Sequence, residues 1–147
     1  MARYFKCVLF FFVFISVDSY GEQLDISQLK AFNELILKET KESQENIIKY
    51  LSDELIVEAN LGTDTQGVTL YYNKAEYIDL IKKSHAKVKN YTEDQEIDVF
   101  GFKIISTNKG EFTVKFYSKI VKRSVWSVIT VELVESKIQI IKIVESA

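Results

Sequence analysis

Few side chains in this sequence could take part in acid–base, nucleophilic or metal chemistry. His85 is the only histidine and Cys7 the only cysteine among the 147 residues, so a cluster of histidine or cysteine metal ligands is excluded. The acid–base hypothesis that remains has His85 lining a pocket, with Asp98 or Glu58 orienting its ring. The alternative is a half-exposed histidine at the edge of an apolar helix face. We expect no metal and no cofactor, since the sequence has no glycine-rich phosphate loop and no metal-binding motif.

The N-terminus has the order of segments found in secretory signal peptides. Arg3 and Lys6 precede an apolar run from Cys7 to Val17, and the small residue Gly21 follows soon after. The run is shorter than the roughly 20 apolar residues that a membrane-spanning helix needs. A secretory signal is therefore the preferred interpretation, and a retained membrane anchor is the alternative.

Cleavage after Gly21 would separate a signal peptide, residues 1–21, from one domain, residues 22–147. That domain has no proline, repeat or low-complexity tract that would mark a further boundary. It would also lack cysteine, because Cys7 lies inside the signal. We expect a secreted or periplasmic protein without disulfides and without a stable membrane span after cleavage.

Two capping boxes predict where helices begin. Asp25 and Gln28 form the first, and apolar residues then recur at helical spacing, namely Ile26, Leu29, Phe32, Leu35 and Ile36. Asn73 and Glu76 form the second, and the helix that follows has an apolar face made of Tyr77, Leu80, Ile81, Ser84 and Val88. A short helix is expected between these two, with Ser43 as its cap.

Period-two alternation of apolar residues predicts the strands. A strand over residues 55–60 and a short extended piece over residues 68–72 precede the second capped helix. The C-terminal third contains four consecutive strands separated by turns, over residues 97–105, 112–121, 125–134 and 138–144. An antiparallel meander is the most economical topology for these four strands.

The order of these elements and two local segments resemble the nuclear transport factor 2-like superfamily, which includes ketosteroid isomerases. Tyr50–Asn60 is similar to the segment where the second helix of that superfamily runs into the first strand. Thr69–Tyr77 is similar to the short strand that leads into the third helix. The resemblance implies an α+β fold in which helices pack on a curved, mainly antiparallel sheet, as a cone-shaped barrel. A cystatin-like arrangement with one helix is the alternative, disfavoured by the capped helix at Asn73.

The resemblance also implies a largely apolar pocket at the mouth of the cone. Isomerases, polyketide cyclases and dehydratases of the superfamily use it for acid–base chemistry, and many other members only bind ligands there. In the isomerases and related cyclases, the general-base aspartate follows a glutamate on the first strand, whereas here Ala59 follows Glu58. A methyl group cannot accept a proton, and Glu58 is expected on the opposite face of the strand. This departure favours binding over catalysis.

We expect the pocket to be lined from the second capped helix and the first two meander strands, by Tyr77, Ile81, Phe100, Phe102, Phe112 and Phe116. By alternation, Asp98 shares a strand face with Phe100 and Phe102. The predicted function is binding of a small apolar ligand in the cone or of a protein partner on the sheet. A cofactor-independent isomerase or dehydratase is the alternative, and a cone filled by its own aromatic side chains is a third.

The strand over residues 125–134 is apolar on both sides, so both of its faces should be covered. Helices can cover one face, and a second subunit can cover the other. We therefore expect a homodimer through the outer face of the sheet, with Trp126, Val128 and Tyr117 in the interface. A nucleic-acid partner is not expected, because the formal net charge is −2.

Overall fold

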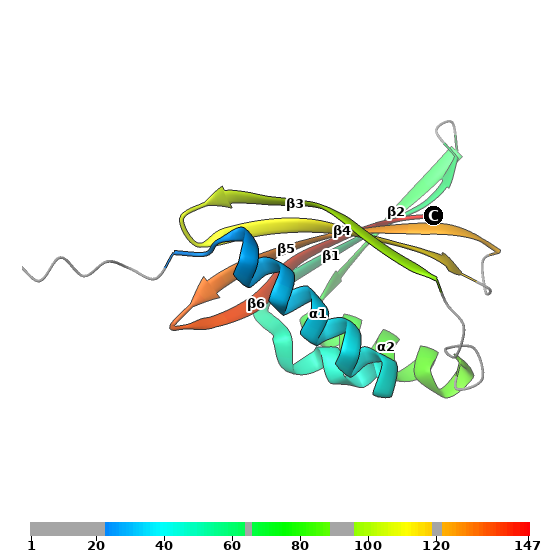
Figure 1. Cartoon of the computed structure of the whole chain (residues 1–147). Helices are drawn as coiled ribbons and strands as arrows, with labels where there is room; N and C mark the ends of the chain where they lie inside the picture. Colours follow the sequence, from blue (N-terminus) through cyan, green and yellow to red (C-terminus); the bar gives the residue numbers. More distant parts are fainter. Residues whose placement is uncertain (1–22, 64–65, 89–95, 119–121) are drawn as a thin grey trace, which may run out of the picture.

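A computed structural model describes residues 23–63, 66–88, 96–118 and 122–147. In these residues a six-stranded sheet is covered on one side by two α-helices and a 3₁₀-helix (Figure 1). We call the side of the sheet toward the helices the inner face and the other side the outer face. The predicted α+β class and the predicted order of elements are both confirmed.

The first capping box forms as predicted and starts helix α1 (Ile26–Glu42). The backbone N–H of Gln28 donates to Oδ1 of Asp25 over 2.8 Å, and the N–H of Asp25 donates to Oε1 of Gln28 over 2.9 Å. The apolar side of α1 is buried against the sheet through Leu29, Phe32 and Ile36. One stripe of apolar residues therefore fixes which face of α1 meets the sheet.

The other two helices also begin at the predicted caps. The hydroxyl oxygen of Ser43 accepts a backbone hydrogen bond at the start of the 3₁₀-helix η1 (Gln44–Tyr50). Helix α2 (Lys74–Val88) begins where Glu76 donates its N–H to Oδ1 of Asn73 over 3.0 Å and accepts from the N–H of Asn73 over 2.9 Å. α2 lies beside strands β1 and β2, whereas α1 lies across β3 and β4.

The sheet combines a meander with one parallel pair. Its strands follow the order β2-β1-β6-β5-β4-β3. The last four form the predicted antiparallel meander, and β1 pairs parallel to β6. The bounds of the six strands are β1 Leu51–Thr63, β2 Gln66–Asn73, β3 Ile97–Ser106, β4 Lys109–Ser118, β5 Arg123–Val134 and β6 Lys137–Ser146.

The predicted barrel is wrong in one respect, because the sheet is not closed. β2 and β3 are its two edges and do not pair with each other within the described residues. The helices cover the apolar inner face, so the sheet does not need to close on itself to keep that face from water. The cone is therefore a curved open sheet with helices across its inner side (Figure 1).

A bulge in β3 changes which of its side chains face inward. Phe100 is paired with Thr113 and Lys103 with Glu111, so Gly101 and Phe102 together lie opposite Phe112. Gly101 has a φ of 71°, the left-handed conformation that glycine adopts readily in such bulges. The extra residue reverses the alternation, and Phe100 and Phe102 end on opposite faces of the sheet.

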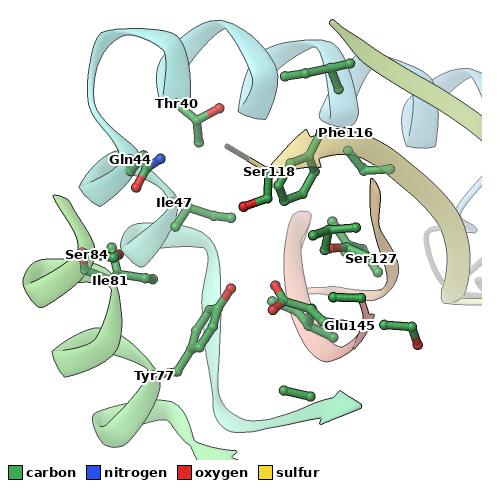
Figure 2. Close-up of a pocket in the computed structure, with 18 of the residues that line it drawn as sticks. Thr40, Gln44, Ile47, Tyr77, Ile81, Ser84, Phe116, Ser118, Ser127 and Glu145 are labelled. Carbon is green, nitrogen blue, oxygen red and sulfur yellow. The ribbon is translucent and has the colours of Figure 1, made fainter. Parts of the chain in front are cut away.

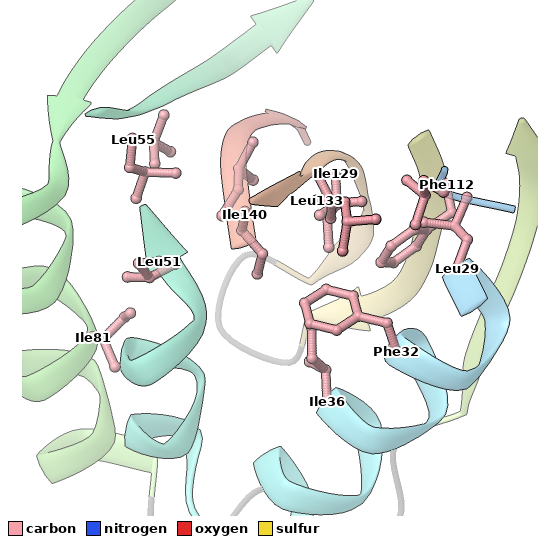
Figure 3. Packing of buried hydrophobic residues seen from close by; sticks show 14 residues of the cluster. Leu29, Phe32, Ile36, Leu51, Leu55, Ile81, Phe112, Ile129, Leu133 and Ile140 are labelled. Atoms are coloured by element: carbon pink, nitrogen blue, oxygen red, sulfur yellow. The ribbon is translucent and has the colours of Figure 1, made fainter. Parts of the chain in front are cut away.

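A cluster of buried hydrophobic residues lies between the N-terminal half of α1 and the inner faces of β4, β5 and β6 (Figure 3). Leu29 is fully buried there, and Figure 3 shows it beside Phe112. A Cβ atom added to Gly110 would lie 3.0 Å from a methyl carbon of Leu29 and 3.1 Å from one of Leu24. The absence of a side chain at Gly110 therefore allows α1 to approach the sheet closely.

Replacement of Leu29 by alanine should lower the free energy of unfolding by about 2–5 kcal/mol, because it leaves a cavity at this contact. Urea denaturation measures the change. Leu35→Ala is the matched control, since Leu35 lies on the same helix and is 43% exposed. Equal losses in the two variants would contradict the packing described here.

Candidate functional site

A cavity of about 570 Å³ lies between the inner face of the sheet and the C-terminal half of α1, η1 and α2 (Figure 2). Most of its lining is apolar, and side chains from the helices and from five strands contribute to it, among them Ile36, Ile47, Ile81, Val114, Ile129 and Ile143. The volume is in the range of pockets that hold small organic molecules. This cavity is the candidate functional site.

Polar residues interrupt the apolar lining, namely Asn33, Thr40, Gln44, Asn60, Tyr77, Ser84, Ser118, Ser127, Glu145 and Ser146. Glu145 on β6 and Ser127 on β5 come from the sheet, and Tyr77 on α2 and Asn33 on α1 come from the helices. Glu145 is opposite Ser127 on one side and Ala59 on the other in the strand register. On the sheet, the carboxyl group of Glu145 is therefore flanked by the methyl group of Ala59 and the hydroxyl group of Ser127. Because both of these side chains are small, they leave space between the carboxyl group and the helices.

Glu145 and Tyr77 form the only acid–phenol pair of the lining that the structure describes. Their side chains are joined by a hydrogen bond, and Figure 2 shows the Tyr77 hydroxyl pointing toward the Glu145 carboxyl. Burial raises the pKa of Glu145 above its usual value, and the hydrogen bond from Tyr77 opposes this shift. Burial and the neighbouring Glu145 both raise the pKa of Tyr77. Tyr77 therefore remains a protonated donor at neutral pH.

Four of the six side chains predicted to line the pocket do so, namely Tyr77, Ile81, Phe112 and Phe116. Phe102 faces inward but lies outside the lining, stacked on Phe112 with ring centroids 5.5 Å apart. Phe100 is 43% exposed on the outer face, so its predicted place in the pocket is corrected. The bulge at Gly101 is the physical reason, because it moves the two phenylalanines to opposite faces.

Of the two predicted acid–base residues, the structure describes the side chain of only one, and that side chain lies away from the cavity. Asp98 is exposed on the outer face, opposite Lys115 in the register, and does not line the cavity. Its neighbour Ile97 does line the cavity, and strict alternation before the bulge therefore turns Asp98 outward. His85 belongs to α2, and its side chain lies outside the described residues.

Ala59 and Glu58 occupy the faces that alternation predicts. Ala59 lines the cavity, and Glu58 lies on the outer face with its Oε2 3.9 Å from Nζ of Lys142. The residue beside Ala59 on β6 is Glu145, so a neighbouring strand places a carboxyl group where β1 has only a methyl group. Glu145 was not predicted as a site residue, because the last strand was expected to end at Val144. If the alternation is continued by two residues beyond Ile143, it places Glu145 on the inner face of the sheet.

The three residues predicted for an interface lie on the outer face or its margin. Trp126 is 42% exposed, and its ring is met edge-on by Phe100 at 5.8 Å and covered by Nζ of Lys115 at 4.8 Å. Tyr117 is exposed and Val128 is half-buried. Trp126 and Phe100 thus form a partly exposed aromatic cluster on the outer face.

The described ranges contain no group of three or more histidine, cysteine, aspartate or glutamate side chains arranged to hold a metal ion. Of the helices in these ranges, none is both long enough and apolar enough to cross a bilayer.

The fold is an α+β fold similar to that of solved nuclear transport factor 2-like proteins. An NTF2-like protein of unknown function from Silicibacter pomeroyi superposes with a TM-score of 0.59 at 10% identity, over 83% of this chain and 98% of that chain. Another, from Methylobacillus flagellatus, gives 0.59 at 8% identity, over 85% and 95%. A domain of unknown function with a cystatin-like fold from Nostoc punctiforme gives 0.58 at 14% identity, over 83% and 76%.

At these identities the likeness shows the fold alone. The chain has the NTF2-like fold that the local sequence resemblance implied. No family model and no curated protein matches the sequence.

Replacement of Glu145 by glutamine tests the desolvation of this carboxyl group. The usual pKa of glutamate is 4.5, and the folded value is raised. The native protein therefore holds this proton more tightly than the unfolded chain, and the resulting stability is lost as the pH rises through the folded pKa. We expect Glu145→Gln to increase the free energy of unfolding by more at about pH 8 than at about pH 4.

Chemical denaturation at the two pH values measures this difference. The same exchange at Glu58, on the outer face, controls for the loss of one acidic side chain. A change in stability for Glu145→Gln that is equal at both pH values would show that the carboxyl group is not desolvated.

Proposed function

We propose that this protein binds a small, mostly apolar molecule in the cavity between the helices and the inner face of the sheet. The observation that carries the proposal is a cavity of about 570 Å³ with an apolar lining and a few convergent polar groups. An apolar ligand would gain roughly 25 cal/mol for each Å² of its apolar surface removed from water. Glu145 and Tyr77 would fix its orientation by contact with one polar group.

The alternative of a cone filled by its own aromatic side chains is less well supported. Phe112 and Phe116 line the cavity without occupying its volume, and Phe100 is turned to the outer face. We propose that the protein carries out this binding after secretion or in the periplasm, on the strength of the signal-like segment at residues 1–21.

Acid–base catalysis is the second candidate function. It is favoured by one observation, a carboxyl group whose pKa is raised by burial next to a phenol in an apolar cavity. Such a pair could move a proton on a bound substrate without a cofactor. Ligand binding remains the first candidate function, because it requires only the cavity and its lining.

A neutral apolar dye tests the binding function. Nile red should become fluorescent with the full chain, and Val114→Phe should weaken its binding about tenfold or more, because the larger side chain enters the cavity lining. Val128→Phe is the matched control, since it makes the same exchange on the outer face. Dye binding that is equally strong in both variants would place the dye elsewhere and remove the support for the proposal.

We also propose that two copies associate through the outer face, because Trp126 and Phe100 expose an aromatic cluster there. Sedimentation at micromolar concentration should show a dimer, and Trp126→Asp should shift it to monomer by placing an unpaired charge in the interface. Tyr71→Asp is the control, since Tyr71 is exposed on the edge strand β2. A wild-type protein that sediments only as monomer would exclude this association.

A further inference from the structure

The described lining of the cavity contains an acidic side chain but no basic one. Glu145 is the only acidic side chain among the described residues of its lining, and no lysine or arginine belongs to that lining. Lys142, the nearest lysine on β6, lies with Glu58 on the outer face. When Glu145 is ionised, it therefore has no cation of the described chain to balance its charge inside the cavity.

The groups that face Glu145 from the neighbouring elements are uncharged. They are Tyr77 from α2, Ala59 from β1 and Ser127 from β5, and η1 contributes the apolar Ile47 to the same lining. Tyr77 supplies one hydrogen bond to a carboxyl group that can accept about four. Glu145 can therefore accept further hydrogen bonds, and the carboxyl group faces the apolar cavity.

Ser127 adds a second polar contact at the same place. Its side chain is buried at 6% exposure and lies opposite Glu145 in the strand register. Directly opposite positions of neighbouring strands lie about 5 Å apart at Cβ, so a single ligand group can reach both side chains.

We infer that the cavity selects apolar molecules that carry a protonated amine over equally apolar molecules that carry a carboxylate. This inference rests on the proposed binding function and names the chemical class of its ligand. An ammonium group has three donors for Glu145 and Ser127, and its positive charge offsets the cost of an ionised carboxylate in an apolar cavity. A carboxylate ligand would instead place two negative charges close together with little water to screen them.

The pH dependence of amine binding follows from the same groups. Burial keeps a proton on Glu145 to a higher pH than usual, and an ammonium ligand displaces that proton. Affinity for an amine should therefore rise with pH until Glu145 is ionised in the free protein. A neutral ligand should show no such rise, because it carries no charge to pair with the carboxylate.

Calorimetry with three indoles of nearly equal apolar surface tests the inference on the full chain. Tryptamine is a cation near neutral pH, tryptophol is neutral and indoleacetic acid is an anion. We expect tryptamine to bind about tenfold or more tightly than tryptophol, and indoleacetic acid to bind more weakly than both. In Glu145→Gln the ratio between tryptamine and tryptophol should fall close to one. In Glu58→Gln, which changes an outer-face acid, the ratio should stay as in the wild type.

The outcomes separate this inference from the proposed function. A wild-type protein that takes up Nile red but binds tryptamine no better than tryptophol, or binds none of the indoles, overturns the inference and leaves the proposed function in place. A wild-type protein that takes up neither Nile red nor any indole overturns both. If Glu145→Gln does not fold, the pH dependence of tryptamine binding to the wild-type protein tests the inference instead. A tryptamine affinity that does not rise with pH would overturn it.

Discussion

The apolar inner face of the sheet is the constraint on which the rest of the structure depends. Strand alternation places Val57, Ile143, Ile129 and Phe112 side by side on that face, and all four are buried. Since the sheet does not close, the helices must keep this face from water. The N-terminal half of α1 does so by direct packing, with Leu29 against Gly110. Its C-terminal half, with η1 and α2, instead encloses the cavity.

The same alternation explains why one strand can carry both core and site residues. Ile140 and Ile143 of β6 are buried in the core, and Glu145, two positions beyond Ile143, reaches the cavity. Placing a carboxyl group on an apolar face costs stability, and the hydrogen bond from Tyr77 offsets only part of that cost. Polar groups in binding and catalytic sites commonly lower the stability of a fold in this way.

Local patterns predicted the parts of the fold that depend on neighbouring residues. Both capping boxes involve residues three positions apart, and Asn73 and Glu76 form theirs as expected. The meander was predictable because its strands follow one another with short connections. The parallel pairing of β1 with β6 joins the first and the last strand of the chain's sheet, and no local pattern carries that information.

The candidate site was only partly predictable for related reasons. Tyr77 and Phe112 follow regular periodicities, so their inward position could be read from the sequence. Phe100 was misplaced because a single glycine, Gly101, reverses the alternation in β3. Glu145 was missed because a charged residue near the end of a strand resembles a solvated terminus. Its burial depends on α2, which lies about 60 residues earlier in the chain and contacts β1.

Native mass spectrometry of the protein purified from its own source can show whether the cavity holds a small molecule. We expect a reproducible additional mass on the wild-type protein that is lost in Val114→Phe and kept in Val128→Phe. A wild-type protein without additional mass, or a mass retained in both variants, would contradict the assignment of the cavity as the binding site.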